Sequence, residues 1–497
     1  MSEATINEPS NRQTRRPLVL TALVLAMFLA AIEGTIVATA MPNIAAKLGG
    51  FSLYGWVFSS YLLMQAVMTP IFGKLSDLFG RKPVFIGGVL TFLLGSALCG
   101  MATTMEWLIA FRFLQGAGAG AVLPISSTLA SDLYTLEERG RVQGYLASVW
   151  GVSSVAGPLA GGLIVQNADW HWIFWLNIPF GIVAILMIVL FLHERIEHRE
   201  RSIDFAGAGL LLVGLSAMML ALTQSAAWGG GAAAGLLVIA AVTLFVFVRH
   251  ERRVPDPLMH LELWNNRFIR LGNIAVLVMG VAMIGLITFI PTFVQGVLGR
   301  SALVAGLALS GMTLGWPMAS VVAGRLFVRV GVRKIVRMGS VAALLGSVTI
   351  ALLAGQGAAF VWVGAFIMGI GFGFLNTTYI VAIQSSVEWG QRGVATASNM
   401  LMRNLGNAIG AALLGGVLNF RLSHYLDRAG VGDEVSLDSV RDLIGDTAPG
   451  ASAVDPSVLP VLQTGLGLGL DLVFWVIVAF AVATFIVSWK VPDLETD

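Results

Sequence analysis

Ionisable side chains inside long apolar runs are the residues of this chain best suited to chemistry. Glu33 lies about fifteen residues into the first apolar run, 18–41, with no Lys or Arg within a helical turn. Charge in the hydrocarbon core is costly, so such residues mark ion or substrate pathways. Burial disfavours the ionised carboxylate, which lets it take and release a proton near neutral pH. We predict that Glu33 binds a proton or a substrate cation; the alternative is that it faces a water-filled cavity and merely attracts cations.

Arg112 is a second candidate for proton coupling, because it lies within the apolar run 107–130. A buried guanidinium needs carboxylate or carbonyl partners. Two interpretations stay open at this point. Arg112 either biases the protonation of Glu33 or Asp77, or it serves as a structural pin between packed helices.

Other charges in or beside the apolar runs are weaker candidates. Asp471, just inside the last run, is a second acid that could take part in coupling. Arg403 poses the same choice as Arg112, and a structural role is favoured because amide side chains stand near it in the sequence. These amides are Asn399, Asn404 and Asn407. Asp132 and Glu138 follow the fourth run and are expected to be solvated or capping residues.

A charged loop, 73–84, separates the second and third apolar runs. It must lie at a membrane face, because it is too charged for hydrocarbon. A cluster of this kind can hold two halves together through a charge–dipole contact with a neighbouring helix terminus, and release them in another state. The alternative is that its positive charges only fix topology. We predict a conformational gate built from Gly73, Asp77, Gly80, Arg81 and Lys82.

The chain contains an internal repeat. The loop pattern that begins at Gly73 returns at Gly324, an offset of 251, and two further blocks recur in the same order near an offset of 253, which pairs Gly140 with Gly393. Repeats in a polytopic membrane protein point to a transporter with its substrate site between them. Val328 stands where the first copy has the loop aspartate, which suggests a role for that acid beyond topology.

Small residues gather in the run 141–165. Small side chains let helices approach closely, and proline removes a backbone donor, so this run predicts a bendable contact surface. Ordinary membrane packing is the alternative interpretation. The residues concerned are Gly157, Pro158, Gly161 and Gly162.

Other classes of chemistry lack their signatures. The chain has no nucleotide-binding Gly-x-x-x-x-Gly-Lys-Ser/Thr loop and no set of Cys and His residues with metal-ligand spacing. We therefore expect no enzyme activity, no cofactor, no metal and no nucleic-acid partner. Energy for transport would come from a gradient, and protons fit the buried carboxylate.

The composition defines the elements that must position these residues. With 57% hydrophobic residues, 12% charged residues and a mean hydropathy of +0.83, this is a membrane protein. Runs of about 20 apolar residues can cross a bilayer as helices, and the continuous runs exclude barrel strands. We predict an all-α polytopic protein with 14 transmembrane helices at 18–41, 55–73, 83–102, 107–130, 141–165, 172–192, 205–225, 231–249, 268–294, 302–323, 335–354, 360–384, 393–418 and 468–489.

The loops and the repeat predict orientation and domains. With both termini cytoplasmic, inner segments hold 23 Lys and Arg residues and outer segments hold 5. We expect a multi-pass protein of the inner (cytoplasmic) membrane, with the two inserted helices peripheral and lipid-facing. The predicted parts are a cytoplasmic tail 1–17, a six-helix bundle 18–192, a linker with two inserted helices 193–267, a second six-helix bundle 268–489 with a long outer loop 420–467, and a cytoplasmic tail 490–497.

Together these blocks resemble the major facilitator superfamily, specifically its fourteen-span drug:proton antiporters. The matching segments are the loop 73–82 (GKLSDLFGRK), Arg112 with Gln115-Gly116, the span 5 segment 157–162 (GPLAGG) and the span 1 segment 35–42 (TIVATAMP). The family motif in span 1 usually has Asp where this chain has Glu33, which keeps the charge on a longer arm.

The resemblance implies two six-helix bundles, plus the two inserted helices, around a central cavity with alternating access. It also implies antiport of protons against amphipathic, mainly cationic drugs, with an exporter role for the span 5 segment. Candidate substrate contacts are Met41, Trp56, Tyr61, Gln65, Phe289, Phe293, Asn376 and Tyr379, for each of which ordinary packing is the alternative.

Two rival functions stay open. One is export of a single endogenous metabolite, lipid or siderophore, and the other is a membrane sensor that keeps the carrier fold. The combination of Glu33, Arg112 and the span 5 segment argues against the sensor, since a receptor need not keep a proton site. We expect a monomer surrounded by lipid, and no docking segment for a periplasmic adaptor is evident.

Overall fold

The computed structural model describes most of the chain, and the described part is helical with no strand. The described residues are 14–49, 53–194, 204–254, 257, 259, 261–430 and 459–493. Parts of four predicted features therefore lie outside them: residues 1–13 of the first tail, residues 494–497 of the second tail, residues 195–203 of the linker, and residues 431–458 of the outer loop.

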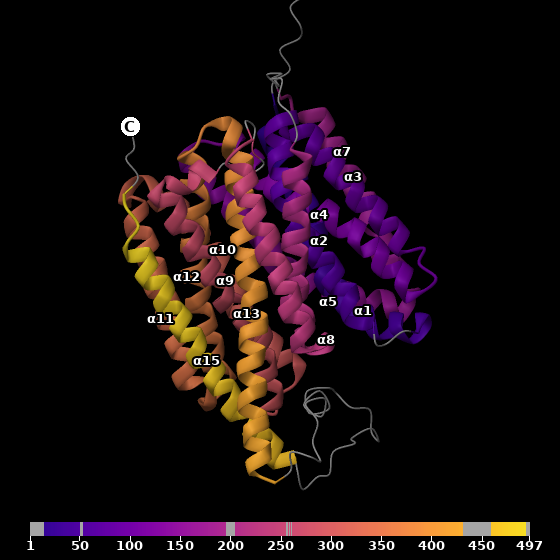
Figure 1. Cartoon of the computed structure of the whole chain (residues 1–497), viewed down its shortest axis with the longest axis vertical. Helices are drawn as coiled ribbons and strands as arrows, with labels where there is room; N and C mark the ends of the chain where they lie inside the picture. Colours follow the sequence, from indigo (N-terminus) through magenta and orange to yellow (C-terminus); the bar gives the residue numbers. More distant parts are fainter. Residues whose placement is uncertain are drawn as a thin grey trace, which may run out of the picture.

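Two halves, each built of long helices, stand side by side (Figure 1). The N-terminal half contains α1 (Arg16–Leu48), α2 (Tyr54–Phe79), α3 (Arg81–Cys99), α4 (Met105–Leu133), α5 (Leu136–Asn167), the short α6 (His171–Trp175) and α7 (Asn177–Phe191). The C-terminal half contains α9 (Arg267–Gly296), α10 (Ala302–Val330), α11 (Val332–Leu353), α12 (Ala358–Ser385), α13 (Arg392–Arg428) and α15 (Leu459–Trp489). Between them lie α8 (Phe205–Glu251) and the short η2 (Leu261–Asn265), while η3 (Ala354–Gln356) and η4 (Trp389–Gln391) connect helices of the second half.

The predicted membrane helices are confirmed. Thirteen segments of the described chain are long and apolar enough to cross a membrane, and they coincide with thirteen of the fourteen predicted runs. The remaining run, 141–165, lies on α5, a continuous helix that packs against α1 and α10. An all-α polytopic architecture follows.

The two inserted runs lie within α8, whose 47 residues would extend about 70 Å if straight. However, Asp204 at its start lies 3.0 Å from His250 near its end, and Gly214 lies against Leu244. The chain therefore doubles back within α8. The first segment packs with α2 and α13 in one apolar cluster, whereas the second is largely exposed. The second segment is thus largely exposed, as predicted for a lipid-facing helix, whereas the first is packed against both halves.

The start of α1 and the end of α15 lie at the same end of the molecule, which we call the terminal face (Figure 1). Here one residue, Gly80, connects α2 to α3 with φ +89°, and its repeat equivalent Gly331 connects α10 to α11 with φ +82°. Glycine adopts positive φ without steric cost, whereas residues with a Cβ rarely do. This requirement explains why both copies of the loop keep the glycine.

Near the terminal face the two halves touch at two glycine crossings related by the repeat. A Cβ on Gly393 of α13 would lie 2.5 Å from the carbonyl oxygen of Gly73 on α2. In the second crossing, a Cβ on Gly140 of α5 would overlap the Cα of Gly324 on α10. Each half therefore contributes one helix to each crossing, and the terminal face is closed.

We expect Gly140→Ala to destabilise this closed arrangement. The added methyl has no space beside Gly324, and overpacking of this kind costs about 1–3 kcal/mol. The measurement is thermal unfolding of the purified protein followed by tryptophan fluorescence. Gly162→Ala on the same helix is the control, because a Cβ there meets nothing within 4 Å. Equal melting temperatures for the two variants would show that the crossing is not tight.

Candidate functional site

Glu33 and Arg112 form an ion pair in the interior of the N-terminal half. Nη1 of Arg112 on α4 lies 2.6 Å from Oε1 of Glu33 on α1, and both side chains are fully buried. The Nε of Arg112 donates to the carbonyl oxygen of Val57 on α2, at 3.0 Å. The guanidinium thus has a carboxylate partner and a carbonyl partner, and it links α1, α2 and α4.

Three polar side chains from α3, α4 and α7 complete this pair. Gln115 accepts a hydrogen bond from Nη1 of Arg112 at 2.8 Å. The Nδ2 of Asn177 donates to Oε2 of Glu33 at 2.8 Å and to the hydroxyl of Ser96 at 2.9 Å. Both carboxylate oxygens of Glu33 therefore have a partner. A buried charge needs this degree of satisfaction to persist in low dielectric.

Tyr61 closes the pair from the side of α2. Its ring lies under the guanidinium of Arg112, 4.3 Å from ring centroid to Cζ, and its hydroxyl donates to the carbonyl oxygen of Ala30 at 3.1 Å. The site is therefore an enclosed cluster in which the charge of Glu33 is balanced by one cation. A proton arriving on Glu33 would remove that balance and leave Arg112 with neutral partners.

Asp77, a second buried acid, joins the two halves at the terminal face. Its Oδ1 accepts from the backbone N–H of Gly393 at 3.0 Å, and its Oδ2 accepts from that of Val394 at 2.9 Å. These are free donors of the first turn of α13, whose own N-cap residue, Gln391, makes no side-chain cap. The carboxylate on α2 therefore caps a helix of the other half, which is the charge–dipole contact predicted for this loop.

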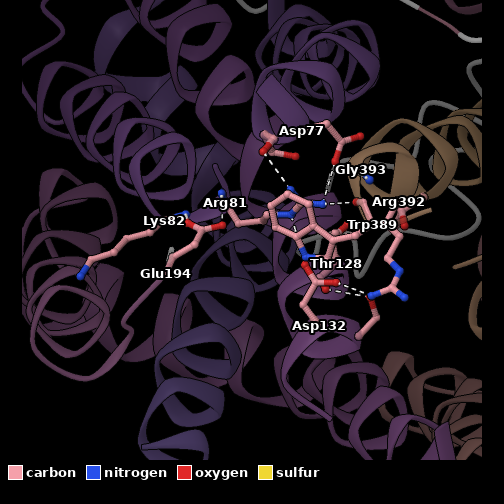
Figure 2. A network of polar contacts seen from close by, with 12 residues as sticks. Asp77, Arg81, Lys82, Thr128, Asp132, Glu194, Trp389, Arg392 and Gly393 are labelled. Atoms are coloured by element: carbon pink, nitrogen blue, oxygen red, sulfur yellow. Dashed lines mark hydrogen bonds and ion pairs between the residues drawn. The ribbon is translucent and has the colours of Figure 1, made fainter. Parts of the chain in front are cut away.

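Arg81 ties Asp77 to a third acid (Figure 2). Its Nη2 lies 2.9 Å from Oδ1 of Asp77, and its Nε lies 3.2 Å from Oδ2 of Asp132 at the end of α4. The same guanidinium lies 3.6 Å from the ring centroid of Trp389 and donates to the carbonyl oxygen of that residue at 2.6 Å. Arg81 thus contacts the second half directly, and it is fully buried there.

Asp132 was expected to be a solvated or capping residue, and that expectation is wrong. Besides Arg81 it pairs with Arg392 of α13, whose Nη1 lies 2.8 Å from its Oδ1. At the repeat-related contact, Arg139 meets the hydroxyl of Ser385 at 3.0 Å, so the acid has no counterpart there. The rim of the terminal face formed by the ends of α4 and α13 is therefore ionic, and the rim formed by the ends of α5 and α12 is not. Glu138, by contrast, closes the capping box of α5 as expected.

Lys82 does not reach the second half. Its ammonium donates to the carbonyl oxygens of Val189 and Leu192 at the end of α7, at 2.9 and 2.6 Å. Glu194 in turn accepts from the backbone N–H groups of Arg81 and Lys82, at 2.8 Å each, and so caps the start of α3. These contacts stiffen the N-terminal half behind the gate residues, which places Lys82 in a supporting position.

The small residues of α5 pack against α1, the helix of Glu33. A Cβ on Gly157 would overlap the hydroxyl of Thr35, and one on Gly161 would lie 3.0 Å from a carbonyl oxygen of α1. Gly162 has open space beside it, and the side chain of Pro158 lies outside the described residues. Two of the four predicted residues thus form the α1–α5 contact surface.

The structure does not bring Asp471 to the buried ion pair. Asp471 is exposed on α15 in the other half, on the same face as the exposed Leu468 and Trp475. No hydrogen bond or ion pair to it is found in the described part of the chain. We expect Asp471→Asn to leave gradient-driven export unchanged, measured as dye accumulation in everted vesicles. A loss as large as that caused by replacing Glu33 would contradict this.

The predicted substrate contacts are divided between the halves. Met41 and Tyr379 are fully buried, and the hydroxyl of Tyr379 lies 3.0 Å from that of Ser488. Phe293 packs edge-on against Phe474 at 5.3 Å between ring centroids. The remaining buried members are Tyr61, Gln65 and Phe289, and the partly exposed members are Trp56 and Asn376.

Arg403 has a different partner from those expected. Asn399 donates to Asn273 of α9 at 3.0 Å, and Arg403 donates to Asn376 of α12 at 3.4 Å. The amides near Arg403 in the sequence therefore do not satisfy it, since residues on adjacent helices lie closer to its long side chain.

The comparisons with known proteins agree with this architecture. Residues 23–411 match the family model described as Major Facilitator Superfamily. The human organic anion transporter MFSD10 (TETRAN) has the same fold, with a TM-score of 0.62 at 16% identity over 94% of this chain and 100% of that one. The chain belongs to the Major Facilitator Superfamily.

Similar bacterial proteins are named as drug transporters. The multidrug transporter protein MdtP of Bacillus subtilis (strain 168) is 35% identical over 84% of this chain and 77% of its own length. Multidrug resistance protein 3 of the same organism is 36% identical over 82% of this chain and 80% of its own length. These relatives place the chain among the efflux transporters of the superfamily.

Proposed function

We propose that this protein is a proton-coupled antiporter that exports amphipathic, mainly cationic compounds by alternating access. The buried pair of Glu33 and Arg112 is the observation that supports this most directly. An acid inside a membrane protein with a single cationic partner can change its charge by one proton, and the partner must then rearrange.

The same helices that hold the pair also carry the acids of the gate. Arg112 and Asp132 lie on α4, about 30 Å apart along the helix. Tyr61 and Asp77 both lie on α2. Movement of α2 or α4 when Glu33 changes charge would therefore reach the terminal face. Proline interrupts both helices between the two sites, at Pro124 in α4 and Pro70 in α2, which gives each a place to bend.

In the proposed cycle, the terminal face is cytoplasmic and opens to load substrate while Glu33 is ionised. The gate then closes through Asp77, and a proton from the opposite side reaches Glu33 and displaces the substrate. The arrangement described here corresponds to the state with the terminal face closed, because Asp77, Arg81 and Asp132 all contact α13 or its preceding turn, directly or through Arg392.

Uptake of a lipophilic cationic dye into everted membrane vesicles tests the proposal. With an acidic lumen, vesicles that contain the protein should accumulate the dye and release protons, and a protonophore should stop both. Competition among chemically unrelated dyes separates multidrug export from export of one metabolite. Accumulation that is insensitive to the pH gradient would refute proton coupling.

A further inference from the structure

Arg403 is an intramembrane cation that has no acidic partner among the described residues. Among the described residues, the guanidinium makes one hydrogen bond, a long one of 3.4 Å to Oδ1 of Asn376. No carboxylate of these residues lies within ion-pair distance of it. Glu33 is already balanced by Arg112, and Asp471 is exposed on another helix. The charge of Arg403 is therefore uncompensated inside the C-terminal half. Intramembrane charge of this kind is costly to keep and marks a functional site.

The surroundings of Arg403 fit an internal binding site. The side chains of Arg403 and Asn376 are both partly accessible and neither is fully buried, so a ligand can reach both of them. Asn399, Arg403 and Asn407 are spaced by four residues and so lie on one face of α13.

Hydrogen-bond donors in this cluster exceed the acceptors. A guanidinium has five N–H donors, and that of Arg403 uses one of them on Asn376. Asn273, fully buried and bonded to Asn399, has an Nδ2 without a partner. Donors of this kind are normally satisfied. Oδ1 of Asn407 is a buried acceptor without a partner, but it can serve only one or two of the donors that Arg403 and Asn273 leave over. A carboxylate is the acceptor that a guanidinium binds most strongly, often through two parallel hydrogen bonds.

We propose that Arg403, supported by Asn376, binds the carboxylate of transported compounds that carry one. This inference rests on the proposed export function and narrows its substrate class to include zwitterions and amphipathic acids. The repeat-equivalent position is Trp150 on α5, so the guanidinium belongs to one half only. Such a substrate would bind asymmetrically, with its acidic end towards α12 and α13.

A matched pair of dyes tests the carboxylate site without any gradient. The probes are a zwitterionic rhodamine with a free benzoate and the methyl ester of the same dye, and binding to the purified full-length protein is followed by fluorescence anisotropy. We expect Arg403→Gln to weaken binding of the free acid about tenfold or more. Binding of the ester should stay unchanged, which also shows that the variant is folded.

Asn376→Asp provides a second, independent variant. It places a carboxylate beside Arg403, and this carboxylate competes with that of the ligand. Binding of the free acid should therefore also be weakened, and binding of the ester should stay unchanged. Equal weakening of both dyes in both variants, or unchanged binding of the acid, would overturn the proposal. If the Arg403→Gln variant binds neither dye, the result with the Asn376→Asp variant decides whether the proposal holds. Because no gradient is applied, a failure of proton-driven export would contradict the antiporter and leave this result standing.

Discussion

Replacing Glu33 by Gln is expected to abolish gradient-driven export while leaving the protein folded. Glutamine keeps the shape of the side chain and one oxygen, which can still accept from Arg112, and Arg112 keeps the carbonyl oxygen of Val57. Asn177 loses its acceptor on this side chain but still donates to Ser96. However, an amide cannot take up a proton at this position. In everted vesicles with an acidic lumen, dye accumulation should fall to the level of vesicles without the protein, and dye-induced proton release should disappear.

Downhill exchange separates loss of coupling from loss of structure. Vesicles preloaded with unlabelled dye should still exchange it through the Glu33→Gln variant, because that process requires no net proton movement. The control is Glu106→Gln, which removes a carboxylate from the exposed first turn of α4. It should export like the parent. Full gradient-driven accumulation by Glu33→Gln would exclude this residue as the coupling acid.

Replacing Asp77 by Asn should open the terminal face. Asparagine retains one oxygen for the two N–H groups of α13 and loses the charge that attracts both Arg81 and the helix dipole. Removing one partner of a buried ion pair costs about 3–5 kcal/mol, so the closed state should lose about a hundredfold or more in population relative to the open one. The reporter is a cysteine at Ala397, which is buried against Gly73 at the crossing.

Labelling of that cysteine by a membrane-impermeant maleimide measures the opening, in a background where Cys99 is replaced by Ser. The labelling rate in Asp77→Asn should exceed that in the parent by at least the same factor as the population of the open state. The matched control is Asp493→Asn on the same face, whose pair with Arg333 is exposed and 3.5 Å long, so it should change nothing. An unchanged labelling rate in Asp77→Asn would mean that other contacts hold the gate closed.

Several features of the site were predictable because they depend on single helices. Glu33 and Arg112 are conspicuous as charges in apolar runs, whatever their neighbours are. Gly80 could be recognised because its backbone angle requires glycine in both copies of the loop. A role of Asp77 beyond topology was indicated because the second copy has Val328 in its place.

Other features were hidden because they depend on how helices are rotated against each other. Asn177 lies near the start of the sixth apolar run and gave only the weak signal of one amide. Asp132 and Arg392 are 260 residues apart, and a single sequence does not show that α4 and α13 meet. Three amides near Arg403 were visible in the sequence, but the sequence does not assign its partner to α12.

The sequence by itself determined the class of protein, the membrane helices, the repeat and the candidate acids. These follow from the cost of exposing backbone and charge to lipid, which acts on each helix separately. Only the tertiary structure decided which charges pair, which rim of the terminal face is ionic, and which guanidinium is left without an acid. Those outcomes are set where glycines let backbones approach, at the crossings of Gly73 with Gly393 and of Gly140 with Gly324, because these crossings fix which side chains face each other.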